Sequence, residues 1–188
     1  MNFELEVPID RDIAVCTIRR GAAADASALS AFAAATFSDT YGRYNDPENL
    51  NRHIASAFNA TQQAWELADP EVATLIAHRD DAFAGYAQVR RADAPACVTH
   101  ASPIELQRFY VDAAWHGCGL AQRLLDEACA AALAFGGPVL WLKVWEQNAR
   151  AIAFYRKSRF IDVGTADFFV GSDRQTDRVL VLSLPERR

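Results

Sequence analysis

The sequence lacks the features that mark several large classes of protein. Its 188 residues have no basic excess, because 19 Lys and Arg stand against 24 Asp and Glu, for a formal net charge of -5. This balance argues against a nucleic-acid-binding protein, which usually has a basic surface. No uninterrupted apolar run approaches the length of a membrane span, and Glu4, Glu6 and Asp10 interrupt the region where a signal peptide has its apolar core. We therefore expect a cytoplasmic protein without a membrane or nucleic-acid partner.

Cysteine and histidine spacings indicate neither a metal site nor a redox site. The four cysteines form no zinc-ligand pattern and no CxxC motif, so free thiols in a reducing compartment are the simplest interpretation. His53, His78 and His100 share no spacing typical of metal ligands, so we assign them no role and expect no metal. The cysteines are Cys16, Cys97, Cys118 and Cys129.

The pattern of apolar residues predicts one α/β domain over residues 1–188. This length suits a single core, and no linker, repeat or low-complexity block divides it. We expect a mixed sheet of about seven strands flanked by about four helices, with a right-handed parallel crossover between residues 104 and 144. Strands are predicted at residues 14–20, 73–78, 82–90, 104–111, 139–144, 160–170 and 178–184, and helices at residues 25–37, 47–58, 61–67, 120–135 and 148–157.

A glycine-containing turn lies between a predicted strand and a predicted helix. In His116-Gly117-Cys118-Gly119-Leu120-Ala121, two residues lack Cβ, so the backbone can approach a ligand or adopt a positive φ. A helix that begins here presents unpaired N–H groups, which suit a pyrophosphate. The third glycine of a dinucleotide fingerprint is missing, and no Lys-Ser or Lys-Thr of a P-loop follows. On the glycines alone, an ordinary tight turn is the simpler interpretation.

The turn nevertheless resembles the cofactor motif of the GNAT superfamily of acyl-CoA N-acyltransferases. That motif is Gln or Arg, two residues, Gly, one residue, then Gly or Ala, followed by a helix with a Leu-Leu pair. The same register here holds His116, Gly119 and Ala121, and then Leu124-Leu125. His116 departs from the family's Gln or Arg, which matters little if this position contacts phosphate through its backbone.

A second, independent segment resembles the same superfamily. The predicted strand at residues 139–144 leads through Asn148 to the aromatic pair Phe154-Tyr155, and Phe160 then opens the next strand. Many members have Gly before this Phe, where the chain has Arg159. Two motifs in the right order are far more specific than one, and the order of strands extends the resemblance over the whole chain.

This resemblance implies a GNAT-like fold with acetyl-CoA as the acyl donor. The strand before the turn would pair its backbone with the pantetheine arm, and one of its N–H groups could face the thioester oxygen. Lys157, with Arg156 or Arg150, could meet the phosphates of coenzyme A, and for Arg150 and Arg156 a solvated side chain is the simpler interpretation. Segments 36–42 and 160–177 look like the branch of PaiA-type polyamine acetyltransferases, which implies a small primary amine as acceptor. The residues carried over as cofactor-binding are Phe109, Tyr110, Val111, His116, Gly117, Cys118, Gly119, Leu120, Ala121, Gln122, Asn148, Ala151, Tyr155 and Lys157.

The implied chemistry is direct attack of a neutral amine in a ternary complex. Tyr155 is the expected general acid, because a phenol can protonate a leaving thiolate; a core tyrosine with a satisfied hydroxyl is the alternative. Glu105 is a candidate base or water relay, and an edge or loop carboxylate is an equally good interpretation. If Phe109 and Val111 share one face, strict alternation puts Glu105 on it, and a bulge would break this parity. Cys118 lies in the phosphate turn, so we expect no acyl-enzyme.

The acceptor site is the part that the sequence determines least. Asp39 and Tyr41, after the first predicted helix, could line it, and a helix-end turn is the alternative. Trp115, Trp141 and Trp145 are expected to pack rather than contact a ligand.

Two other functions fit the same motifs. A noncatalytic acyl-CoA-binding module would keep the cofactor site without turnover, and an acyltransferase for a protein or peptide N-terminus would differ in its acceptor pocket. The size of that pocket depends on residues 25–67 and 91–103, where sequence patterns say least. An edge strand near the C-terminus could pair two copies as a homodimer, and the oligomeric state stays open.

Overall fold

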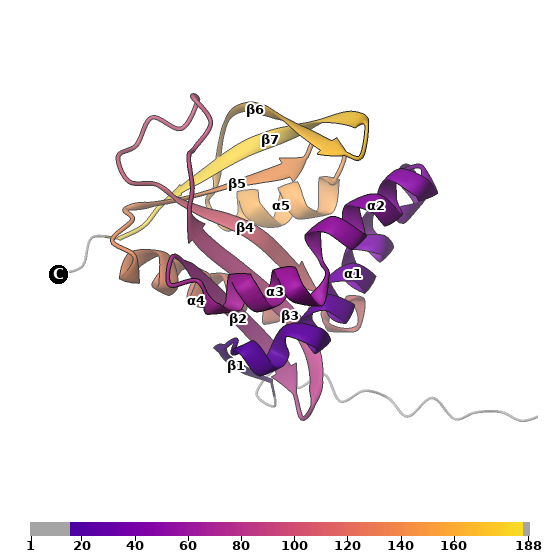
Figure 1. The fold of residues 1–188 in the computed structure, drawn as a ribbon. Helices are drawn as coiled ribbons and strands as arrows, with labels where there is room; N and C mark the ends of the chain where they lie inside the picture. The colour runs from indigo at the N-terminus through magenta and orange to yellow at the C-terminus, as the bar shows by residue number, and fades with distance from the viewer. Residues whose placement is uncertain (1–15, 186–188) are drawn as a thin grey trace, which may run out of the picture.

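The computed structural model describes residues 16–185, which form a seven-stranded mixed sheet with helices on both faces (Figure 1). The strand order is β1-β2-β3-β4-β5-β7-β6, and all neighbours are antiparallel except β4 and β5. This arrangement confirms the predicted α/β fold with a mixed sheet. Residues 14 and 15 of the first predicted strand lie outside the described range. The strands are β1 (Thr17–Arg20), β2 (Val72–Arg79), β3 (Ala82–Arg91), β4 (Ile104–Val111), β5 (Val139–Trp145), β6 (Ile161–Val170) and β7 (Asp173–Ser183).

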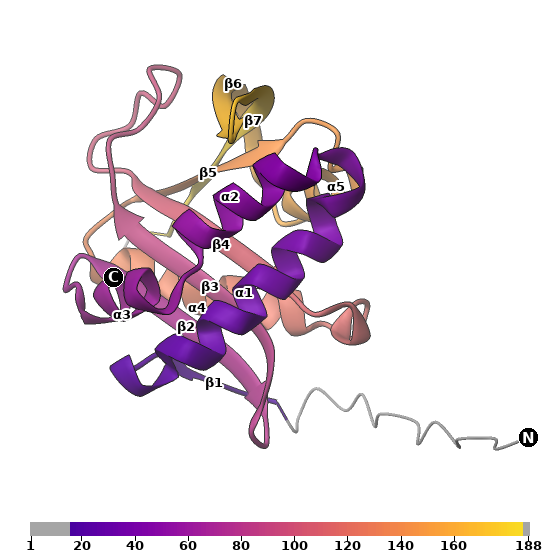
Figure 2. The same ribbon diagram turned by 45° about the vertical axis from the view of Figure 1, so that its right-hand side comes forward.

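Helices cover both faces of this sheet, as Figures 1 and 2 show. α1, α2 and α3 lie on one face, and α4 and α5 lie on the other. Local signals set their ends: Asp46 caps α2 by accepting the N–H groups of Glu48 and Asn49, and Gly136 ends α4 with a φ of +80°. No helix of residues 16–185 is long and apolar enough to cross a membrane. The α-helices are α1 (Ala26–Tyr41), α2 (Pro47–Ala57), α3 (Ala60–Ala68), α4 (Leu120–Ala134) and α5 (Ala149–Lys157).

Each face of the sheet has its own apolar core. The larger core lies beneath α4 and α5, where Leu120, Leu124 and Leu125 pack on side chains of the central strands. The helices of the other face enclose a second core that includes Phe37 and Tyr86. Burial of these side chains, more than helix or strand propensity, holds the layers together.

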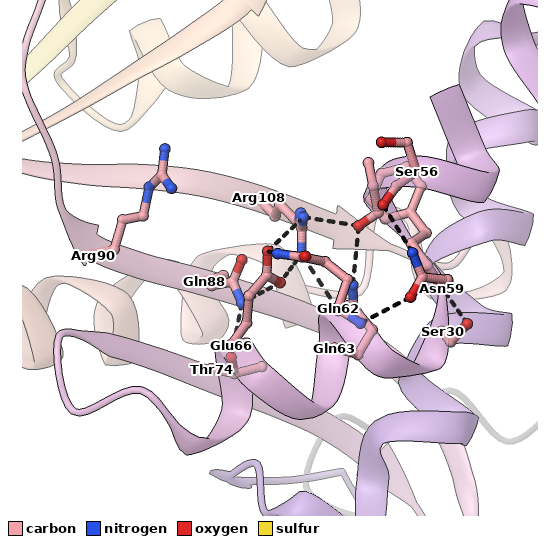
Figure 3. A network of polar contacts seen from close by, with 12 residues as sticks. Ser30, Ser56, Asn59, Gln62, Gln63, Glu66, Thr74, Gln88, Arg90 and Arg108 are labelled. Atoms are coloured by element: carbon pink, nitrogen blue, oxygen red, sulfur yellow. Dashed lines mark hydrogen bonds and ion pairs between the residues drawn. The ribbon is translucent and has the colours of Figure 1, made fainter. Parts of the chain in front are cut away.

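A buried polar network fastens α3 to the central strands (Figure 3). Arg108 of β4 forms an ion pair with Glu66 of α3, and the two side chains are only 9% and 12% exposed. Arg108 also donates to the carbonyl oxygen of Ala57 at 3.1 Å, and Gln88 of β3 donates to Glu66 at 3.2 Å. With these partners both buried charges are compensated, which is the condition for tolerating them in an interior.

The central strand β4 contains a bulge at Gln107. Successive residues of β3 pair with Arg108 and Leu106, so Gln107 has no partner in the ladder. Phe109 and Leu106 both belong to the core beneath α4, although three positions separate them. The expectation that Glu105 shares the face of Phe109 is therefore wrong, because the bulge reverses the alternation.

The sheet opens between β4 and β5. These two strands pair only through Ile104 with Leu140 and Glu105 with Trp141, and beyond this point they diverge (Figure 1). β4 stays paired with β3 as far as Val111. The edge of β4 that faces β5 is consequently open over most of its length.

Candidate functional site

A cavity of about 380 Å³ occupies the opening between β4 and β5. We call it the inter-strand cavity. Phe109, Tyr110 and Val111, which the family resemblance placed beside the cofactor, line it from β4. Its other walls are the end of α1, the turn before α4, the divergent part of β5 and the start of α5. The backbone N–H and C=O groups on the open edge of β4 can pair with a ligand. A narrow, extended ligand would suit the space between these two strands.

The glycine turn closes one end of the inter-strand cavity. Gly117 has a φ of +81°, and a Cβ added there would meet no heavy atom within 4 Å. Gly119 has a φ of +93° and stands at the N-cap of α4, where no side chain within residues 16–185 forms a capping hydrogen bond. The first N–H groups of α4 are thus left for a ligand, and the helix dipole favours an anionic one.

Only part of this turn faces the cavity. His116, Gly117 and Ala121 line it. Leu120 is fully buried in the core. Cys118 donates its thiol hydrogen to the carbonyl of Trp115 at 2.9 Å, and Gln122 donates its side-chain amide to Asp126.

Two hydrogen bonds hold His116 and a cation beside the turn. The Nε2 of His116 lies 2.9 Å from the carbonyl oxygen of Val111, and its Nδ1 lies 2.7 Å from Nη1 of Arg150. Because arginine can only donate, Nδ1 accepts and Nε2 carries the hydrogen. Arg150 lines the cavity, so it has a defined place that the sequence did not assign to it. Lys157 and Arg156 are exposed at the end of α5 and are not among the lining residues.

The start of α5 supplies polar groups to the same cavity. The Oδ1 of Asn148 accepts the N–H of Ala151 at 3.1 Å and caps the helix, and both residues line the cavity. Tyr155 lines it one turn further on and is only 7% exposed. Burial raises the pKa of Tyr155, and the nearby Tyr41 acts in the same direction, so the phenol stays protonated.

Asp39 and Tyr41 lie within α1 and not after it. The helix runs four residues beyond the predicted end at residue 37, because the ring of Tyr41 packs on Phe37 at 4.7 Å between centroids. Exposed Asp39 lines the inter-strand cavity. Burial raises the pKa of Tyr41, and hydrogen bonds with Asn148 and Tyr110 oppose this shift.

A second cavity of about 200 Å³ lies on the face of α1 and α2. We call it the aromatic cavity. His53 stacks on Phe37 with 4.9 Å between ring centroids and meets Phe168 of β6 edge-on at 5.6 Å. Trp145 also lines this cavity and packs edge-on against Tyr41 and Tyr44, whereas Trp115 and Trp141 are buried. The aromatic lining residues are Phe37, Tyr41, His53, Phe58, Tyr110, Trp145 and Phe168.

Two buried carboxylates line the aromatic cavity. Glu105, 4% exposed, accepts a hydrogen bond from Nε of Arg90 at 2.8 Å. Asp177, 5% exposed, has an Oδ1 with no hydrogen-bond partner within the described part of the chain. Burial raises the pKa of Asp177 to about 6, and Lys143 opposes this shift while Glu146 adds to it.

The two cavities are neighbours that share part of their lining. Four residues line both of them: Tyr41, Gln107, Tyr110 and Lys143. We call this meeting point the junction. It includes Gln107, the bulge residue of β4. The two cavities adjoin each other at these four side chains.

Comparison with known proteins agrees with this architecture. Residues 34–160 match the model of the family described as "Acetyltransferase (GNAT) family". An uncharacterized N-acetyltransferase of Mycobacterium tuberculosis is 32% identical over 160 residues, which cover 85% of this chain and 98% of that protein. Another, of Lactobacillus delbrueckii subsp. lactis, is 30% identical over 149 residues, covering 79% of this chain and 86% of its own length.

Solved structures share the same fold. The PaiA N-acetyltransferase of Thermoplasma acidophilum, crystallised with coenzyme A, superposes with a TM-score of 0.71 at 20% identity, covering 89% of this chain and 98% of that chain. YncA of Salmonella typhimurium, crystallised with acetyl-CoA, has a TM-score of 0.63 at 20% identity, covering 92% of this chain and 96% of that one.

Proposed function

The chain belongs to the GNAT family of acetyltransferases, and we propose that residues 1–188 act as one domain that transfers acetyl from acetyl-CoA to the primary amine of a small, polyamine-like molecule. The transfer is direct attack in a ternary complex. One observation carries this proposal: the separation of β4 from β5 creates a cavity that ends at an uncapped helix N-terminus and meets a second cavity at the junction.

The residues around the inter-strand cavity fit coenzyme A. The open edge of Phe109, Tyr110 and Val111 offers backbone groups to the amides of an extended arm. Gly117 has no Cβ, and the position that a Cβ would occupy borders open space. The N–H groups of the first turn of α4 suit a pyrophosphate. Arg150, oriented by His116, adds a positive charge at the same end.

The roles of the reacting groups follow from their positions. When bound, acetyl-CoA supplies the acetyl group as a reactive thioester. Tyr155 holds a phenolic proton within the inter-strand cavity and donates it to the leaving sulfur. The burial that raises the pKa of Tyr155 would also make a thiolate beside it more basic, so burial does not oppose this transfer.

Glu105 is the proposed acceptor of the amine's proton, directly or through water. It lies on the wall of the aromatic cavity, on the side from which an amine would reach the junction. Its ion pair with Arg90 fixes its orientation. Asp39 and Tyr41 are proposed to contact the amine from the end of α1.

Replacement of Tyr155 tests the mechanism. We expect Tyr155→Phe to lower kcat on the order of a hundredfold, with little change in the KM for acetyl-CoA, because the variant loses a proton donor and keeps its ring. Release of free thiol from acetyl-CoA, measured over a panel of polyamines, amino acids and short peptides, reports both values.

Tyr86→Phe is the matched control. Tyr86 is fully buried, lines neither cavity and has a hydroxyl without a hydrogen-bond partner in the described residues, so its loss should leave turnover unchanged. Tight binding of acetyl-CoA without thiol release on any amine would replace the proposal with a noncatalytic binding module. Release with peptides alone would indicate a protein N-terminus as acceptor.

A further inference from the structure

The aromatic cavity contains a polar group that the proposed transfer does not use. Asp177 of β7 lies opposite Trp145 of β5 and lines this cavity. Its carboxylate is 95% buried, since the residue is 5% exposed, and its Oδ1 has no partner among residues 16–185. A buried carboxylate oxygen without a donor is costly to the folded state. A ligand that brings a hydrogen-bond donor into the cavity would remove that cost.

The walls around Asp177 favour a donor that is positively charged. Aromatic ring faces attract ammonium groups, most strongly where water is excluded, and rings form much of this cavity. His53 does not oppose a cation, because burial, aided by Arg108, lowers its pKa and keeps its ring neutral at pH 7. The hairpin of β6 and β7 contacts α2 through Asn49, which accepts the N–H of Ser172 at 3.4 Å. This hydrogen bond links α2 to the β6–β7 hairpin, and both contribute lining residues to the aromatic cavity.

The arginines of the aromatic cavity already have carboxylate partners. Arg90 pairs with Glu105 at 2.8 Å, and Arg108 pairs with Glu66. Neither guanidinium is therefore paired with Asp177. Lys143, the other cation that lines this cavity, is exposed and lowers the pKa of Asp177, but the two form no ion pair within residues 16–185. Asp177 is the carboxylate of this cavity that a ligand cation can reach without breaking an ion pair.

Two nitrogens of one molecule would meet opposite environments at the junction and at Asp177. Lys143 lines the junction, and a like charge there lowers the pKa of an amine and favours the neutral form that attacks. An amine paired with Asp177 would instead be held protonated and could not attack. The group at Asp177 must then be a second nitrogen and not the reacting one.

Resting on the proposed acyl transfer, we infer that Asp177 binds a second, protonated nitrogen of the acceptor while the reacting nitrogen lies at the junction. The acceptor class is a small molecule with two amino groups joined by an apolar spacer. The spacer passes the aromatic rings, and Asp177 selects such molecules over amines with one nitrogen.

The test compares α,ω-diamines of three to six carbons with monoamines of the same chain length. Calorimetric binding to the enzyme saturated with coenzyme A gives Kd, and thiol release from acetyl-CoA gives kcat/KM. At least one diamine should bind about tenfold or more tightly than its monoamine, a difference of about 1.4 kcal/mol. Asp177→Asn should reduce this ratio to within about twofold of unity. Asp167→Asn, which removes a surface carboxylate of β6 away from both cavities, should preserve it.

The outcomes separate this inference from the proposed function. Diamines that bind no better than monoamines, or a preference that survives Asp177→Asn, would overturn the role of Asp177 even if thiol is released. A preference that depends on Asp177 without thiol release on any amine would support the binding site and contradict the acyl transfer. Both measurements use the full chain, and circular dichroism of each variant confirms that it is folded.

Discussion

Single residues at this site combine a local structural task with a place in the wall of a cavity. Asn148 caps α5 and also lines the inter-strand cavity, and His116 bonds to the end of β4 while it orients Arg150. Such residues are hard to interpret from sequence alone, because the local task already explains their presence. Asp177 differs, since its unpartnered oxygen serves no local structure.

The titration of Asp177 should be visible in the stability of the protein. Its pKa is about 6 in the folded chain against 3.8 for the free group. Between these two pKa values, the carboxyl group of Asp177 is therefore more often protonated in the folded state than in the unfolded state. Its contribution to stability is present below about pH 4 and is lost as the pH rises through about 6. Relative to wild type, the unfolding free energy of Asp177→Asn should grow by on the order of 2 kcal/mol over this window. Urea denaturation from pH 4 to pH 7.5 measures the difference, and parallel curves would contradict it.

At the scale of elements, the turn before α4 combines a left-handed backbone with a place in the wall of the inter-strand cavity. Gly117 and Gly136 stand at opposite ends of this helix with φ of +81° and +80°, and in both cases an added Cβ has open space. A side chain at either position would strain the backbone to a similar degree. Of the two glycines, Gly117 lines the inter-strand cavity and Gly136 does not.

Alanine at these two glycines should separate stability from cofactor binding. Gly117→Ala and Gly136→Ala should each cost about 1 kcal/mol of unfolding free energy, because a left-handed φ is unfavourable for alanine. Only Gly117→Ala should also raise the KM for acetyl-CoA, by about tenfold. Denaturation and initial-rate kinetics on the same preparations provide the comparison. Equal KM values in the two variants would show that the turn does not contact the cofactor.

Most of the helices and strands could be predicted, because regularly spaced apolar residues mark their extent and capping residues mark their ends. β4 was predicted residue for residue, and α2 begins at Pro47 after its Asp46 cap, as expected. β7 begins five residues earlier than predicted, because pairing with β5 and β6 stabilises its polar first half. Asp177 lies in that half.

The aromatic cavity could not be predicted, because its lining residues come from elements distant in the chain. His53, Trp145 and Asp177 belong to α2, β5 and β7 and share no motif. The bulge at Gln107 was equally hidden, since only the pairing with β3 defines it. Motifs marked part of the inter-strand cavity because most of its lining residues lie within residues 106–121 and 143–155, although the wall from α1 comes from a separate segment.

At the scale of the whole molecule, the helices that bound the aromatic cavity are attached to the sheet by charge as well as by apolar packing. Arg108 reaches from β4 to Glu66 of α3, and the same residue contacts the carbonyl of Ala57 at the end of α2. Arg108 also lines the aromatic cavity. This buried ion pair thus adds to apolar packing in setting the position of these helices relative to β4.

Breaking the ion pair between Arg108 and Glu66 should strongly lower the unfolding free energy. Glu66→Gln leaves the charge of Arg108 buried without its counterion, so we expect a loss of about 3 kcal/mol in unfolding free energy. Glu48→Gln, which breaks the exposed pair with Arg52 on α2, should cost less than about 0.5 kcal/mol. Urea denaturation of both variants tests the contrast, and equal losses would mean that the buried pair adds nothing beyond a surface pair.

The short ladder between β4 and β5 limits how far added hydrogen bonds in the sheet can raise the thermal stability of this protein. The N–H and C=O groups along the open edge of β4 can be bonded to β5 or offered to a ligand, but not both. Under the proposed function, a variant that closed the ladder would gain sheet hydrogen bonds and lose the place for acetyl-CoA. Substitutions that raise heat resistance and keep activity are then expected outside this gap.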